Sequence, residues 1–159
     1  MKKSQQLKRT TLFLLFFGMM FISAFAQTSA YSGKEFIVAF GKNSNIATVD
    51  NAGNVQLILR IAAIEDANVS IKFYNSASSN ATIPVQAGEI RDYVLSYNQA
   101  AASYSGSSGK SAKSIAVSST GLISLIAVNT ASASAEATLV MPVERLGTEY
   151  IYTGLYYFS

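Results

Sequence analysis

The side chains that most often carry chemistry at neutral pH are missing from this sequence. Its 159 residues include no histidine and no cysteine. The chain therefore lacks the imidazole that serves as the usual general base and transition-metal ligand. It also lacks the thiol needed for a disulfide, a thiolate zinc site or a cysteine nucleophile. We expect a protein that is not an enzyme and that uses no cofactor and no metal.

A segment rich in serine and glycine resembles two catalytic motifs without completing either. Residues Tyr104–Ser111 read Y-S-G-S-S-G-K-S. A phosphate-binding loop needs glycine where Tyr104 stands, with a strand before it and a helix after it. Ser107 and Lys110 have the spacing of Ser/Lys acyl enzymes, but that pair acts from one turn of a helix, which the surrounding Gly and Ser residues disfavour. We expect a solvated loop.

The acidic residues do not form a catalytic or metal-binding set. The oxygen-rich stretch Asp50–Asn54 contains one carboxylate, so a hairpin turn explains it better than a calcium site. Glu65 and Asp66 adjoin in a predicted turn, while Glu89 and Asp92 face opposite sides of a predicted strand. Neither pair is placed for general acid–base catalysis across a cleft. No catalytic, cofactor-binding or metal-binding residue is predicted.

Tyrosine is the residue type that most suggests binding. Exposed tyrosines anchor protein partners and stack on sugar faces, although tyrosine also simply suits strands. One group surrounds the loop described above and another lies near the C-terminus. The candidate contacts for a ligand or partner are Tyr93, Tyr97, Tyr104, Tyr150, Tyr152 and Tyr156.

The first 26 residues are expected to be a secretory signal peptide. Met1–Thr10 carries positive charge, Thr11–Phe25 is strongly apolar, and the run ends in Ala24-Phe25-Ala26, the small-x-small pattern of a cleavage site. The alternative, an uncleaved anchor, is disfavoured because the apolar run is shorter than the ~20 residues of a spanning helix. We expect cleavage after Ala26, a domain at 27–159, and a location in a periplasm, at the cell surface or outside the cell.

The charge of the chain without this segment argues against nucleic acid as a partner. Lys2, Lys3, Lys8 and Arg9 lie in the segment, which leaves eight basic and nine acidic residues. Nucleic-acid binding requires a basic patch, because phosphate contacts dominate affinity. We expect a protein or glycan partner, no nucleic acid, and no membrane contact after cleavage. Pairing of a β-edge with another chain is a further expected contact.

The remaining sequence reads as short strands separated by turn residues, with two-residue alternation throughout. Val55, Leu57, Leu59 and Ile61 share one face of a strand, as do Val69, Ile71 and Phe73 of the next. Ala81–Val85 contains Pro84, which suits an edge strand or the end of a strand. The strand Leu122–Val128 is apolar on both faces and should be central and covered on both sides. Strands are also predicted at Glu35–Phe40, Glu89–Leu95, Ala112–Ser118, Glu136–Val143 and Glu149–Phe158.

Two connections complete the prediction of an all-β protein. Thr120-Gly121 reads as a tight turn between two strands, and Tyr97–Ser111 reads as a long flexible loop in which Gln99–Ala102 could form a helical turn. Eight or nine short strands with almost no helix indicate an antiparallel two-sheet β-sandwich, with a partly open β-barrel as the alternative.

Several segments, taken in order, resemble the N-terminal domain of the IgGFc-binding protein family. They are G-K-E-F-I-V-A-F, N-V-S-I-K-F-Y, V-Q-A-G-E-I-R-D-Y-V-L, K-S-I-A-V-S-S-T-G-L-I-S-L-I-A-V-N and A-T-L-V-M-P-V-E-R-L-G-T-E-Y, between Gly33 and Tyr150. The resemblance extends to about Tyr157 and implies an exported β module, often found beside adhesion domains, without catalytic residues or cofactors. The family's domain continues past this point, so the chain resembles a fragment or a domain whose last strands come from elsewhere.

The function predicted from these features is binding. The first hypothesis is a non-catalytic binding or adhesion module of a bacterial cell surface that recognises a protein or glycan. The second is a structural or assembly domain whose C-terminal edge pairs with another chain. A hydrolase is the least favoured reading, because His and Cys are missing.

Overall fold

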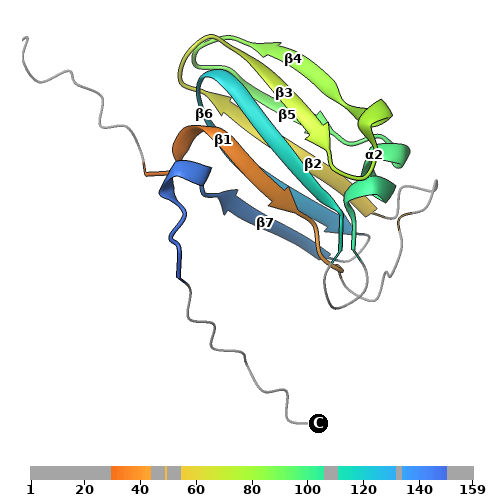
Figure 1. The fold of residues 1–159 in the computed structure, drawn as a ribbon. Coiled ribbons are helices and arrows are strands. Elements are labelled where there is room, and N and C mark those ends of the chain that lie inside the picture. The colour runs from red at the N-terminus through yellow and green to blue at the C-terminus, as the bar shows by residue number, and fades with distance from the viewer. Residues whose placement is uncertain (1–29, 44–48, 50–54, 106–110, 132–133, 150–159) are drawn as a thin grey trace, which may run out of the picture.

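The fold is known from a computed structural model, which describes residues 30–43, 49, 55–105, 111–131 and 134–149. This part of the chain forms seven strands, one short α-helix and two 3-10 helices, arranged as in Figure 1. In order they are β1 (Ser32–Ala39), β2 (Val55–Ala63), β3 (Ala67–Phe73), η1 (Ala77–Ser79), β4 (Ala81–Val85), β5 (Ile90–Val94), α2 (Tyr97–Ser103), β6 (Ser114–Ala131), β7 (Ser134–Val140) and η2 (Val143–Arg145).

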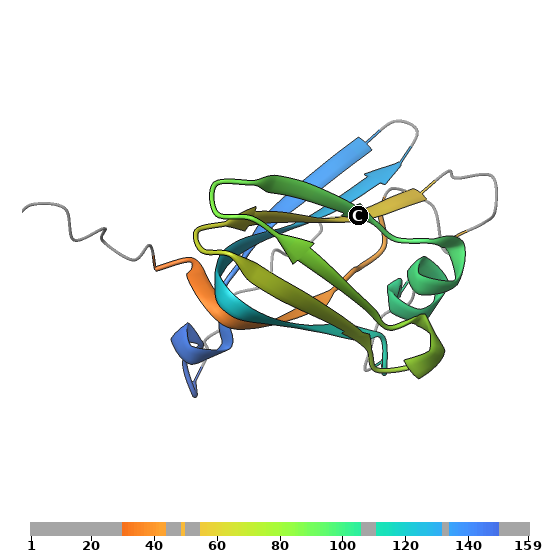
Figure 2. The same ribbon diagram turned by 90° about the horizontal axis from the view of Figure 1, so that it is seen from above.

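All strands join one antiparallel sheet in which β6 is the common member. The order β4-β3-β6-β2-β5 forms one path, and β1 and β7 also pair with β6. The first half of β6 lies between β3 and β1, while its second half lies between β2 and β7. Because β6 bends in the middle, the sheet curls and its two halves face each other (Figure 2). Strands that bend from one half to the other are a known way to build such a corner.

The predicted all-β antiparallel class is confirmed, and so are several strand positions. β4 lies at the edge of the sheet, as Pro84 predicts, because proline has no N–H to give to a second neighbour. The two facing halves resemble a sandwich, and the curl resembles an open barrel, since the halves are continuous through hydrogen-bonded strands. The stretch Asp50–Gly53 and most of the strand predicted at Glu149–Phe158 lie outside the described residues.

The predicted tight turn at Thr120-Gly121 is wrong, because β6 runs through these residues as a single strand of 18 residues. Gly33 of β1 pairs with Ile123, whereas Glu35 pairs with Ser118, so β6 has residues 119–122 where β1 has only Lys34. The chain bends here instead of reversing. A Cβ atom on Gly121 would lie 2.6 Å from the carbonyl oxygen of Asp66, so only glycine fits against this backbone.

The carboxylates of Glu65 and Asp66 hold the same corner. Glu65 Oε2 accepts a hydrogen bond of 2.9 Å from the Leu122 amide, and Asp66 Oδ1 accepts one of 2.8 Å from the Ala87 amide. The Ile64 amide donates to the Leu122 carbonyl at 2.9 Å. The contacts to Leu122 satisfy backbone groups of β6 at the bend, and the contact to Ala87 holds the turn between β4 and β5 beside it. Glu65 and Asp66 are therefore structural acids at the bend.

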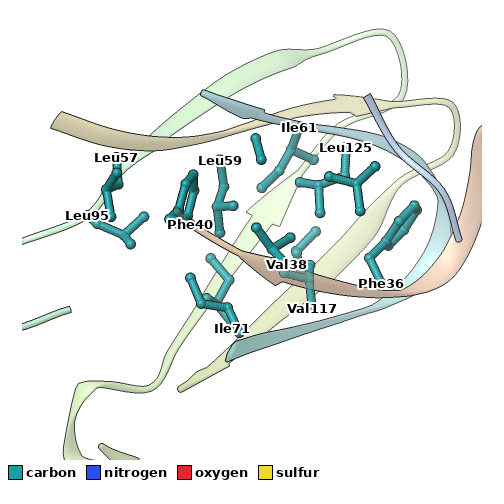
Figure 3. Close-up of a cluster of buried hydrophobic side chains, with 14 of the residues drawn as sticks. Phe36, Val38, Phe40, Leu57, Leu59, Ile61, Ile71, Leu95, Val117 and Leu125 are labelled. Atoms are coloured by element: carbon teal, nitrogen blue, oxygen red, sulfur yellow. The ribbon is translucent and has the colours of Figure 1, made fainter. Parts of the chain in front are cut away.

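The hydrophobic core fills the space between the two halves of the sheet. Figure 3 shows Phe36, Val38 and Val117 on one side and Leu57, Leu59, Ile61 and Leu125 on the other. The alternation predicted for β2 and β3 is confirmed, since the apolar face of each is buried. Burying each large aliphatic side chain contributes about 1.5–3 kcal/mol. In β6 the predicted burial on both faces holds for one face only, because Leu122, Ile126 and Val128 are half-buried.

The first part of the segment Tyr97–Ser111 is the helix α2, which contains the helical turn considered at Gln99–Ala102 and extends it at both ends. Ser96 is its N-cap and forms a capping box with Gln99, whose amide donates to the Ser96 hydroxyl while its side chain accepts from the Ser96 amide. Such a box offsets the cost of starting a short helix. Ala100 and Ala102 are buried against the core, so tertiary packing also stabilises α2. Residues 106–110 lie outside the described residues.

We predict that Gly121→Ala lowers the free energy of unfolding by about 1–3 kcal/mol, because its methyl group must displace the Asp66 carbonyl. Gly41→Ala is the matched control, since no atom lies within 4 Å of its Cβ position. The control should leave stability unchanged or raise it by up to about 1 kcal/mol. Urea unfolding followed by circular dichroism measures both. Equal stability of the two variants would contradict this account of the bend.

Candidate functional site

The structure places the first three candidate tyrosines in three different environments. Tyr93 on β5 is half-buried, and its hydroxyl accepts a 2.7 Å hydrogen bond from Nε2 of Gln99. Gln99 Nε2 also donates to the Ser79 carbonyl at 2.8 Å. Tyr93 therefore helps to hold α2 against β5. Tyr97, the first residue of α2, is 45% exposed and remains accessible to a partner.

The prediction that Tyr104 contacts a ligand at the surface is corrected by its burial. Its side chain is 2% exposed and belongs to the core. The hydroxyl accepts a 3.0 Å hydrogen bond from the amide of Asn43, which would otherwise be a buried donor without a partner. The Tyr104 carbonyl accepts from Nζ of Lys113 at 2.9 Å. Tyr104 is a structural residue because its apolar ring and polar tip are both satisfied inside the fold.

The three candidate tyrosines that the structure describes do not gather into one surface. Tyr93, Tyr97 and Tyr104 are divided between a helix contact, the solvent and the core. Tyr150, Tyr152 and Tyr156 lie outside the described residues. The structure brings a different set of residues together, on the side of β6 occupied by β1 and β7.

A groove lies between β1 and β7, with a volume of about 310 Å³. Both strands pair with β6 on the same side, β1 with its first half and β7 with its second. Because β6 bends between these two halves, β1 and β7 diverge from their ends near η2 (Figure 2). The groove is lined by Ile37, Val38, Ala39, Phe40, Gly41, Ala127, Asn129, Glu136, Thr138, Leu139, Val140, Met141 and Leu146.

The groove exists because nothing among the described residues covers the inner face of β7. Thr138 pairs with Ala127 of β6, and Glu136 pairs with Asn129. Directly paired residues share a face of the sheet. Ala127 and Asn129 are buried, but Thr138 and Glu136 are exposed. The core is complete under β6 and incomplete under β7.

The rim of the groove is unusually apolar for an exposed surface. Ile37, Leu139, Met141 and Leu146 are 57%, 44%, 41% and 45% exposed. Among the described residues, β1 and β7 each pair with β6 alone, so each strand has a second edge with no strand beside it. Phe40, just after β1, forms a single bridge with Tyr104. An apolar groove bordered by two sheet edges can take an extended peptide, which would gain backbone hydrogen bonds and side-chain contacts.

The end of the groove nearest η2 is fixed by a tight contact. A Cβ on Gly33 would clash with Cβ of Pro142 and with Oε1 of Glu144. The chain that leaves β7 therefore crosses directly over the start of β1. This contact sets where the two strands are closest.

A buried polar network fixes the opposite end. Asn43 is 0% exposed, and its Nδ2 donates to the Asn129 carbonyl at 2.8 Å. Asn129 Nδ2 in turn donates to the Gly41 carbonyl at 3.0 Å, and the Ser134 hydroxyl donates to Oδ1 of Asn43. With the Tyr104 hydroxyl, these contacts tie the chain after β1 to both β6 and β7. Satisfied networks of this kind rigidify a fold.

The chemistry that the groove offers is non-covalent. Glu136 is its one lining residue with a charged side chain. In the described part of the chain, no three acidic side chains lie close enough to hold a metal ion. Two ion pairs join described residues, Arg60 with Asp92 at 2.7 Å and Arg91 with Glu89 at 3.6 Å. The shorter one lies on β2 and β5, across β6 from the groove. The hydrogen bond from Arg60 lowers the pKa of Asp92, which is a local effect on an exposed face.

Sequence reasoning missed the groove, and only one weak signal could have indicated it. The face of β7 that ends in Val140 is interrupted by Glu136 and Thr138, whereas the buried faces of β2 and β3 are wholly apolar. An interrupted apolar face indicates a strand that is incompletely covered. The strand prediction at Glu136–Val143 did not use this signal.

Comparison with protein-family models, with curated proteins and with solved structures found no match for this chain. The resemblance to the IgGFc-binding N-terminal domain thus stays a prediction from the sequence segments. Among the described residues, no helix is both long enough and apolar enough to span a membrane.

We predict that Tyr104→Phe lowers the free energy of unfolding by about 1–3 kcal/mol, because the buried Asn43 amide loses its acceptor. Tyr97→Phe is the matched control, since the same hydroxyl is removed from a side chain that is 45% exposed. The control should stay within about 0.5 kcal/mol of the unchanged protein. Thermal unfolding of the two variants tests this, and a larger effect at Tyr97 would refute the structural role of Tyr104.

Proposed function

We propose that the chain is an exported, non-catalytic binding module that recognises a protein partner, and that the β1–β7 groove receives an extended segment of that partner. The observation that carries the proposal is the uncovered inner face of β7 beside the edge of β1. An added strand would complete both the sheet and the core. Export is supported by the signal-peptide features of residues 1–26.

A protein partner is favoured over a glycan by the placement of the tyrosines. Sugar recognition by stacking needs exposed aromatic faces. The exposed tyrosines among the described residues, Tyr31, Tyr74 and Tyr97, do not line the groove, and its aromatic lining residue, Phe40, is buried. The groove instead combines aliphatic side chains with two sheet edges, which suit a polypeptide. The resemblance to a family of exported β modules supports the same class of function. A sequence without His or Cys supports binding over catalysis.

An assembly domain is the second candidate, and it is favoured by the same edges. Sheet edges that are not paired or covered promote association between chains. In that case the partner segment comes from another subunit of a surface structure. The two candidates differ in whether the protein is a monomer that binds unrelated peptides or a subunit that associates with its own kind.

The test uses residues 27–159 on an array of random ten-residue peptides and on a glycan array. We expect selected peptides with alternating apolar residues, and we expect Thr138→Arg to weaken their binding at least tenfold, because the long charged side chain occupies the groove. Ile90→Arg is the control on β5, where the native side chain is 69% exposed. It should change the dissociation constant less than twofold.

Three results would count against the proposal. Glycan binding that Thr138→Arg leaves intact would move the site away from the groove and change the ligand class. Equal losses in Thr138→Arg and Ile90→Arg would show that the groove is not the site. Self-association without peptide binding, measured by light scattering, would favour the assembly domain. Circular dichroism of each variant confirms that the fold is retained.

A further inference from the structure

The chain leaves the described part of the fold beside the groove. β7 ends at Val140, the chain crosses β1 at Pro142, and η2 follows at Val143–Arg145. Leu146, the next residue, lines the groove. Tyr150 is therefore tethered to the groove by only a few residues. A short tether of this kind gives a linked segment a millimolar effective concentration at its site.

The direction of the chain suits pairing with β7. β7 runs toward η2, so a segment that returns from η2 along the groove runs antiparallel to β7. Two strands that follow each other in the sequence can pair in antiparallel fashion through a short connection. The residues of β7 extend over about 23 Å at ~3.3 Å per residue, and ten further residues can span about 33 Å. The segment Tyr150–Ser159 is long enough to follow the whole strand.

The composition of this segment matches the groove. Tyr150–Ser159 reads Y-I-Y-T-G-L-Y-Y-F-S and has no charged side chain. If it is extended, Ile151, Leu155 and Tyr157 share one face. Burial of these apolar side chains against an apolar surface is favourable. If the segment stayed exposed, it would promote aggregation. The groove has an apolar rim but no cover among the described residues.

We propose that Tyr150–Ser159 of the same chain docks in the β1–β7 groove as an additional strand paired with β7. The segment covers Thr138 and the apolar rim, and an external partner must displace it. This inference goes beyond the proposed function and stands without it, because it requires only the groove and the chain's own C-terminal residues. It identifies the groove as a site at which an internal strand competes with a partner strand.

Disulfide trapping tests the proposal in the full chain, which contains no cysteine of its own. Thr138→Cys is combined in turn with a single cysteine at each position from Ile151 to Tyr157. Docking as a strand predicts disulfides within one molecule at every second position, because alternate side chains face Thr138. Each tail cysteine is also paired with Ile90→Cys, an exposed position on β5, as the matched control. Cross-linking there should be at least tenfold lower.

The outcomes separate the alternatives. Disulfide-linked dimers in place of monomers would overturn the proposal, because the segment would then belong to a second copy. Equal trapping at Thr138 and Ile90, or trapping without alternation along the tail, would also overturn it. Circular dichroism of the reduced variants checks the fold. If partner peptides bind but no internal disulfide forms, this inference fails while the proposed function stands. If an internal disulfide forms but no peptide binds, the proposed function fails while this inference stands.

Discussion

The bend of β6 at Gly121 is the constraint on which the other features of this fold depend. One strand serves both halves of the sheet, so its direction at the corner decides how the halves face each other. The Asp66 carbonyl comes so close to Gly121 that a side chain is excluded. Glu65 accepts the Leu122 amide at the bend, and Asp66 accepts the Ala87 amide of the adjacent turn between β4 and β5. The core forms because this corner folds the two apolar faces together.

The same bend produces the groove. β1 and β7 follow different halves of β6 on one side, so they separate as β6 changes direction. At one end Gly33 packs against Pro142, and at the other Asn43 and Asn129 hold the chain after β1 against the β6–β7 pair. The groove is thus bounded by two fixed ends. A rigid, preformed site loses less conformational entropy when it binds an extended segment.

The chemistry of the molecule follows from what lines these surfaces. Carboxylates that could have suggested catalysis serve the fold: Glu65 and Asp66 accept backbone amides at the corner, and Asp92 pairs with Arg60. The groove presents aliphatic side chains, sheet edges and one carboxylate, Glu136. The specificity of such a surface comes from its shape, its apolar contacts and the backbone hydrogen bonds that it can form.

The sequence by itself determined which side chains of β2 and β3 are buried. Val55 to Ile61 and Val69 to Phe73 alternate, and alternation fixes the faces of a strand wherever it lies. Pro84 fixed β4 at an edge for an equally local reason, its missing N–H. The composition without His or Cys also limited the available chemistry from the start.

Only the tertiary structure decided the bend, the burial of Tyr104 and the groove, because each depends on residues far apart in the chain. Thr120-Gly121 has the local signature of a turn, but contact with Asp66 makes it a bend within one strand. Tyr104 is buried in the core, where its hydroxyl accepts a hydrogen bond from the amide of Asn43, 61 residues away in the chain. The groove lies between β1 and β7, which no local pattern relates, because both pair with the same side of β6 and their separation is set by its bend.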